Sequence, residues 1–91
     1  MKVRAGLRTR ESEDGSGLEV VDVTKDGSAD KAGILKGDKI IKWNKKDLAN
    51  RAAFVEDLRT HEPGDKVQAV VLRDGEEKTV YVELQGAKDG L

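Results

Sequence analysis

The sequence has 91 residues, with 17 basic and 18 acidic side chains, one histidine and no cysteine. This length provides for one small domain. The balanced charge argues against a broad cationic surface for nucleic acid, the lack of cysteine excludes disulfides and thiolate chemistry, and a single histidine excludes a two-histidine metal site. No apolar run reaches the roughly 18 residues of a membrane helix. The composition therefore favours a binding domain and predicts no metal, no other cofactor and no direct membrane insertion.

Periodicity and turn residues predict five strands and two helices. Alternating or β-branched apolar residues are typical of strands, which are expected over residues 3–10, 18–23, 39–43, 67–72 and 79–84. Ser28 is expected to cap a short helix that Gly33 ends. Asn50 is expected to cap a second helix over 51–61, which carries one apolar stripe. Short strands around two helices predict an α+β domain with a curled, mostly antiparallel sheet.

Three further residues are interpreted as structural. Trp43 is expected to lie half-buried on its strand, and Asn44 is expected to adopt a positive φ at a hairpin tip. His61 is expected at the end of the second helix, near the negative pole of its dipole. No serine has a histidine partner at a readable spacing, so nucleophilic catalysis is not expected.

One segment carries a specific motif. Residues 28–44 read Ser-Ala-Asp-Lys-Ala-Gly-Ile-Leu-Lys-Gly-Asp-Lys-Ile-Ile-Lys-Trp-Asn. This resembles the signature of bacterial PDZ domains, Ser-Pro-Ala-x-x-Ala-Gly-Leu-x-x-Gly-Asp-x-Ile-x-x-Val-Asn-Gly. The segment from Pro63 to Gly75 resembles the last hairpin of the same family. The resemblance implies a PDZ-like sheet or partial barrel of five to six strands capped by two helices. We expect the domain to cover residues 1–86, and the mostly polar last residues to form a flexible tail over 87–91.

The resemblance also implies where a ligand would bind. In the permuted arrangement of the bacterial, envelope-protease-associated type, the ligand-holding strand comes first in the chain. The family's carboxylate-binding loop then falls on Ala5, Gly6 and Leu7, with Arg4 just before it, and Gly6 allows a close approach of the ligand. A peptide would add a strand to the sheet. The groove that would hold it is implied to be lined by Ala5, Leu7, Thr9, Arg51, Phe54, Val55 and Leu58.

Such a domain is a non-catalytic module for protein–protein interaction that recognises C-termini or extended segments. The expected partner is a peptide or protein C-terminus with a hydrophobic last residue, and Arg51 is expected to favour an acidic residue third from its end. We expect the module to recruit substrate for, or regulate, a larger bacterial protease of the periplasm or cell envelope. That parent protease domain would be a second partner, either a trypsin-like serine protease or a zinc aminopeptidase.

An architectural role is the alternative. Here the groove would dock on the parent chain or a sister subunit and would have no free peptide ligand. The chain ends in Asp89-Gly90-Leu91, which fits the ligand preference just described. Self-association is therefore a second possibility, with Leu91 entering a neighbouring molecule's pocket and Asp89 approaching Arg51.

Overall fold

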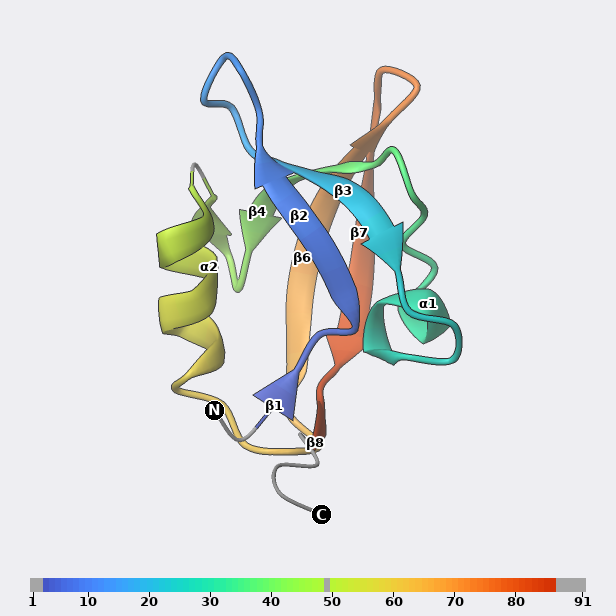
Figure 1. The fold of residues 1–91 in the computed structure, drawn as a ribbon, viewed down its shortest axis with the longest axis vertical. Helices are drawn as coiled ribbons and strands as arrows, with labels where there is room; N and C mark the ends of the chain where they lie inside the picture. Colours follow the sequence, from blue (N-terminus) through green and yellow to red (C-terminus); the bar gives the residue numbers. More distant parts are fainter. Residues whose placement is uncertain (1–2, 49, 87–91) are drawn as a thin grey trace.

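The computed structural model describes residues 3–48 and 50–86, and every structural statement below concerns these residues. They form eight strands and two helices (Figure 1). In chain order the elements are β1 (Val3–Arg4), β2 (Leu7–Glu11), β3 (Leu18–Val23), α1 (Ser28–Ala32), β4 (Lys39–Trp43), β5 (Lys46–Asp47), α2 (Arg51–Leu58), β6 (Lys66–Arg73), β7 (Glu76–Glu83) and β8 (Gln85–Gly86).

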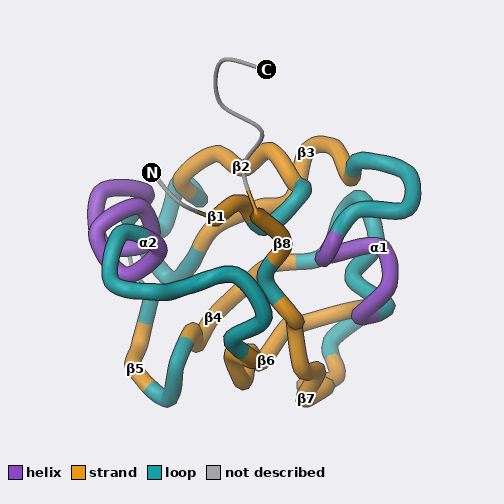
Figure 2. Tube along the Cα trace, turned by 90° about the horizontal axis from the view of Figure 1, so that it is seen from below, coloured by secondary structure: helices purple, strands orange, loops and turns teal. Residues whose placement is uncertain are grey.

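The main sheet is antiparallel and has six strands. Its order is β2-β3-β4-β6-β7, and β5 pairs with β4 at one side. β1 and β8 form a separate antiparallel pair that brings the two ends of the described chain together. Figures 1 and 2 show α1 and α2 on opposite sides of the molecule, with α1 beside β7 and α2 beside β2. The predicted fold of a curled antiparallel sheet with two helices is confirmed.

The prediction of one continuous first strand is wrong, because the strand is interrupted in its middle. Residues 3–10 were expected to be continuous, but the chain bends between β1 and β2 at Ala5 and Gly6. Gly6 has φ +74°, a conformation that ends strand geometry and that glycine adopts without steric cost. The bend separates the short β1 from β2, and β2 becomes an edge strand of the main sheet.

The helix ends differ in part from the prediction. Gly33 ends α1 with φ +93°, and the Asn50 side chain accepts a hydrogen bond from the amide of Ala53 at 2.8 Å, both as expected. The expected Ser28 cap is wrong, because Gly27 occupies the cap position and Ser28 is the first helical residue. The second helix ends at Leu58 rather than at residue 61.

The hairpin between β4 and β5 agrees with the sequence. Asn44 and Lys45 adopt φ values of 55° and 68°, which suit a two-residue turn with the twist of the adjoining strands. No helix in the described ranges is long and apolar enough to cross a membrane.

The core lies between the sheet and the two helices. Trp43 is only 2% exposed and is therefore more deeply buried than expected. Its ring meets Phe54 of α2 edge to face, with centroids 4.8 Å apart and an interplanar angle of 73°, a favoured aromatic geometry. The other large apolar side chains that are fully buried come from strands β1, β3, β4, β6 and β7, from the α1–β4 turn and from the residue between β7 and β8: Val3, Leu18, Val20, Ile34, Ile40, Val67, Val71, Val82 and Leu84.

A buried ion pair fixes the turn between α1 and β4. Asp38 is 2% exposed, and its two carboxylate oxygens accept from Arg73 Nε and Nη2 at 2.8 and 2.6 Å. The same Asp38 accepts from the amide of Leu35, and Arg73 also reaches the carbonyl of Gly33. Burial alone raises the pKa of Asp38, but the hydrogen bonds from Arg73 and Leu35 outweigh it and hold the pKa below its usual value.

We expect Asp38→Ala to lower the free energy of unfolding by about 2–4 kcal/mol, because Arg73 would lose its carboxylate partner in a partly buried place. Urea denaturation followed by Trp43 fluorescence measures the loss. Glu19→Ala is the matched control, since it breaks the exposed Arg10–Glu19 pair and is expected to cost about 1 kcal/mol or less. Equal losses in the two variants would contradict this role for Asp38.

Candidate functional site

A groove of about 310 Å³ lies between β2 and α2. It is lined by Arg4, Ala5, Gly6, Leu7, Thr9, Thr24, Arg51, Phe54, Val55 and Leu58. All nine candidate residues named from the sequence lie around this one groove. Thr24 is the residue that sequence reasoning missed. It follows β3 in the chain, and the pairing of β3 with β2, together with the hydrogen bond from its own amide to the carbonyl of Gly6, brings it to the groove.

The loop between β1 and β2 is anchored through its carbonyl groups. The carbonyl of Arg4 accepts from Ser28 Oγ at 3.4 Å, that of Ala5 from the amide of Ala29 at 2.9 Å, and that of Gly6 from the amide of Thr24 at 2.9 Å. All three carbonyls therefore point toward the segment that runs from the end of β3 into the first residues of α1. In a planar trans peptide the N–H points opposite to the C=O, so the amides of residues 5–7 point away from that segment.

Gly6 is required by the space around it. A Cβ atom at this position would lie 3.1 Å from the amide nitrogen of Ser28 and 3.2 Å from Cα of Gly27. The φ of +74° adds a second obstacle to any other residue. The loop thus passes so close to the start of α1 that only glycine fits without a shift of the backbone.

The polarity of the groove changes from one end to the other. On β2, Leu7 and Thr9 are partly buried while Arg8 and Arg10 are exposed, which confirms the alternation predicted for this strand. On α2, Phe54 and Leu58 are buried at 5% exposure each. The groove is therefore apolar near the anchored loop. It is more polar at its other end, where α2 begins.

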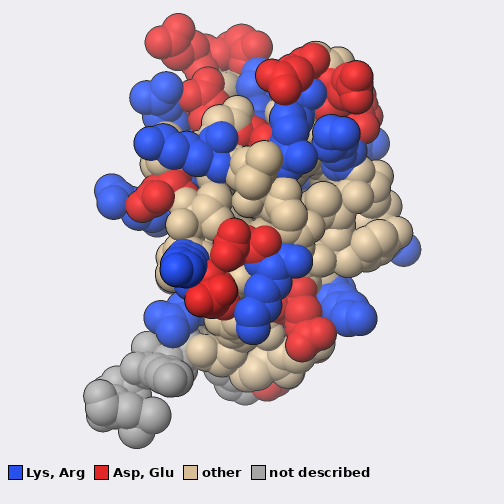
Figure 3. Space-filling view, turned by 90° about the vertical axis from the view of Figure 1, so that its right-hand side faces the viewer, with Lys and Arg blue, Asp and Glu red and all other residues tan. Residues whose placement is uncertain are grey.

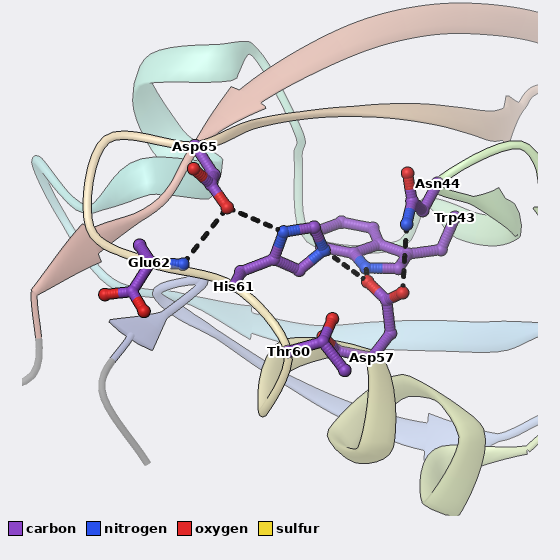
Figure 4. Close-up of polar contacts among 7 residues, drawn as sticks. All are labelled: Trp43, Asn44, Asp57, Thr60, His61, Glu62 and Asp65. Atoms are coloured by element: carbon purple, nitrogen blue, oxygen red, sulfur yellow. Dashed lines mark hydrogen bonds and ion pairs between the residues drawn. The ribbon is translucent and has the colours of Figure 1, made fainter.

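Side chains from β4 and from the turn that follows it hold α2 against the sheet. Trp43 Nε1 donates to Asp57 Oδ2 at 2.8 Å, and Asn44 Nδ2 donates to Asp57 Oδ1 at 3.0 Å (Figure 4). Asp57 lies on the side of α2 away from the groove, next to Leu58 in the chain. These two hydrogen bonds, together with the contact between the Trp43 and Phe54 rings, fix the helical wall.

His61 extends this network beyond the helix. Its Nε2 lies 2.8 Å from Asp57 Oδ2 and its Nδ1 lies 3.0 Å from Asp65 Oδ2 (Figure 4). The sequence placed His61 on the helix, but the helix ends earlier and two carboxylates take the place of the helix dipole. Burial alone lowers the pKa of His61, but the hydrogen bonds and charges of Asp65 and Asp57 outweigh it and raise the pKa above its usual value. Only the protonated ring can donate to both carboxylates.

The sequence matches the PDZ domain family model over residues 4–84. It is 31% identical over 86 residues to the serine protease Do-like HtrA of Lactobacillus helveticus, covering 94% of this chain and 19% of that protein. The chain thus spans about a fifth of the length of this relative.

Two solved structures have a similar fold. A region of an aminopeptidase N family protein from Idiomarina loihiensis matches with a TM-score of 0.86 and 32% identity, covering 96% of this chain and 14% of that one. The HtrA3 PDZ domain bound to a phage-derived ligand, FGRWV, matches with a TM-score of 0.82 and 22% identity, covering 94% and 88% of the two chains. The latter likeness concerns the fold alone.

A small antiparallel sheet with an open edge strand facing a helix defines a class of binding module that adds a peptide to its sheet. The match over most of its length places the chain within one family of that class. The chain belongs to the PDZ domain family, and it is a binding module rather than an enzyme.

Gly6→Ala is expected to lower the free energy of unfolding by about 2–3 kcal/mol, the sum of a strained φ and a close backbone contact. Gly75→Ala is the matched control, because Gly75 also has a positive φ but nothing lies within 4 Å of its added Cβ. We expect the control to lose only about 1 kcal/mol. Equal losses in chemical denaturation would mean that the close approach to α1 does not constrain the loop.

His61→Gln is expected to make stability less dependent on pH. The folded-state pKa of His61 lies above the unfolded value of 6.5, so the stabilisation from protonated His61 is complete below that value and is lost as the pH rises through the folded-state pKa. The wild type should exceed the variant by on the order of 1–2 kcal/mol near pH 5.5, and by less near pH 9. A pH-independent difference in denaturation experiments would rule out this role.

Proposed function

We propose that this PDZ domain binds the C-terminus of a peptide or protein, with the terminal carboxylate at residues 4–7 and the last side chain in the groove. The observation that carries the proposal is the anchored loop. Its three carbonyls are engaged by Ser28, Ala29 and Thr24, so the amides that follow them face away from those partners. Converging backbone amides around a glycine form a favourable site for an anion. Arg4 is exposed beside the loop and adds a positive charge.

The rest of the peptide would lengthen the sheet. β2 is an edge strand of the main sheet, and it opens onto the groove. The edge strand at the far end of the sheet, β7, carries exposed Glu76, Glu77 and Lys78, and charged edges discourage strand pairing. On that side of the molecule basic and acidic side chains are interspersed (Figure 3). These features favour β2 as the strand that receives the peptide by main-chain hydrogen bonds.

The apolar end of the groove accounts for a hydrophobic last residue. Leu7, Phe54, Val55 and Leu58 lie around it, next to the anchored loop. Burying a side chain of the size of valine, leucine or phenylalanine there contributes roughly 1.5–3 kcal/mol. We propose Thr9 and Arg51 as contacts for the ligand residues that precede the last one.

The parent protein is proposed to be a larger bacterial protease. The Lactobacillus relative is by name a serine protease and the Idiomarina relative an aminopeptidase, and in both the matched region is a small share of the chain. This supports a substrate-recruiting or regulatory domain over 1–86. The tail over 87–91 and the expected insertion of Leu91 into a neighbouring molecule lie outside the described residues.

Peptide titration tests the function. We expect a peptide with a C-terminal valine or leucine to bind with micromolar to millimolar affinity, and we expect Val55→Asp to weaken binding at least tenfold because it puts a charge into the apolar end. Ala52→Asp is the matched control, since Ala52 lies exposed on the same helix outside the groove. It should leave the affinity within about twofold. Equal effects of the two substitutions, or no binding by the wild type at millimolar peptide, would contradict the proposal.

A further inference from the structure

Glu11 connects the two walls of the groove. It is the last residue of β2, and its Oε2 accepts a hydrogen bond from the backbone amide of Arg51, the first residue of α2, at 3.1 Å. Within the described residues this is the one polar contact between β2 and α2. Figure 1 shows the end of β2 and the start of α2 toward the same end of the molecule, opposite the β1–β2 loop.

The start of α2 explains why a carboxylate is bound there. The helix has no acidic residue in its first turn, and the Asn50 side chain is used by the amide of Ala53. The amide of Arg51 is therefore left for a partner from elsewhere, and a carboxylate is favourable at the positive end of a helix dipole. Glu11 supplies from β2 the charge that the helix itself lacks.

The negative charge of Glu11 is not neutralised by Arg10, its neighbour on the strand. Arg10 points to the other face of β2 and pairs with Glu19 at 2.8 Å. Glu11 and Arg51 are both exposed, so a ligand side chain can reach them. A ligand group at this end of the groove therefore meets a carboxylate that already occupies the helix start.

The direction of the ligand brings its upstream residues to this place. A peptide that pairs antiparallel with β2 and has its C-terminus at Gly6 runs from Glu11 toward the loop, so the residues before its last one lie along β2 toward Glu11. Because side chains on one face of a strand recur every second residue, the third ligand residue from the end lies near Thr9, between the loop and the β2 terminus. Its side chain then approaches the end of the groove that Arg51 lines.

We propose that Glu11 determines the charge preference of the groove at this upstream position. By holding a carboxylate on the amide of Arg51, it cancels the attraction of Arg51 for an acidic ligand residue, so the wild-type groove disfavours acid there and accepts a neutral or basic residue. The expectation from Arg51 alone is the opposite. The inference rests on the proposed peptide-binding function, since it concerns the same groove.

The test is a double-mutant cycle in which the charge at position 11 of the protein and the charge of one peptide residue are both varied. Three peptides with the same hydrophobic last residue carry glutamate, glutamine or lysine third from the end, and their affinities are measured for the wild type and for Glu11→Gln. The glutamine side chain keeps an oxygen for the amide of Arg51 but removes the charge. We expect the variant to bind the glutamate peptide about two- to fivefold more tightly relative to the glutamine peptide, as for exposed charge pairs, and the lysine peptide relatively more weakly.

Two further variants distinguish a specific effect from a general one. Glu13→Gln removes the same charge from the exposed β2–β3 loop, which makes no hydrogen bond or ion pair with α2 among the described residues, and it should leave the preference unchanged. Arg51→Gln added to Glu11→Gln should abolish the gained preference for glutamate.

Each other outcome overturns the inference. If Glu11→Gln changes all three affinities equally, Glu11 acts on the shape of the groove and not on charge. If Glu13→Gln has the same effect as Glu11→Gln, the cause is the overall field of the domain. In both cases peptide binding, and with it the proposed function, still stands. If no peptide binds to any variant, the proposed function itself is wrong.

Discussion

The anchoring of the β1–β2 loop on the start of α1 is the constraint on which the groove depends. Hydrogen bonds from Thr24, Ser28 and Ala29 engage successive carbonyls of the loop. Since the carbonyls are held, the orientation of the following amides is also held. Gly6 permits this arrangement because no side chain separates the loop from Ser28. A backbone site prepared in this way would bind the proposed carboxylate without the entropic cost of ordering flexible side chains.

The opposite wall of the groove depends on a different set of contacts. Asp57 accepts from Trp43 on β4 and from Asn44 in the β4–β5 turn, and it contacts His61 beyond the end of α2. These contacts lie on the side of α2 that faces away from the groove, so they fix the helix without obstructing a ligand. The two walls are therefore positioned independently, and among the described residues the polar contact between them is that of Glu11 with Arg51.

Local pattern predicted the type of most elements and the caps at Gly33 and Asn50, because short-range propensity decides these features. The resemblance to PDZ domains predicted which residues would line the groove, and the structure places these residues together. Long-range contacts were not predictable. The hydroxyl of Ser28 looks like a helix cap in the sequence, but it donates to the carbonyl of Arg4 and accepts from the amide of Gln85. The bend at Gly6 also depends on contacts with the start of α1, which is distant from Gly6 in the sequence.

The account is tested most directly by comparing one peptide with a free C-terminal carboxylate and the same peptide as a C-terminal amide. Titration of the isotope-labelled domain, followed by NMR, reports both affinity and the amides that respond. We expect the free acid to shift the amide signals of residues 5–7 most strongly, and we expect amidation to weaken binding by roughly tenfold or more, since charge-assisted hydrogen bonds are lost. Equal affinities, with no response from the loop amides, would contradict the account.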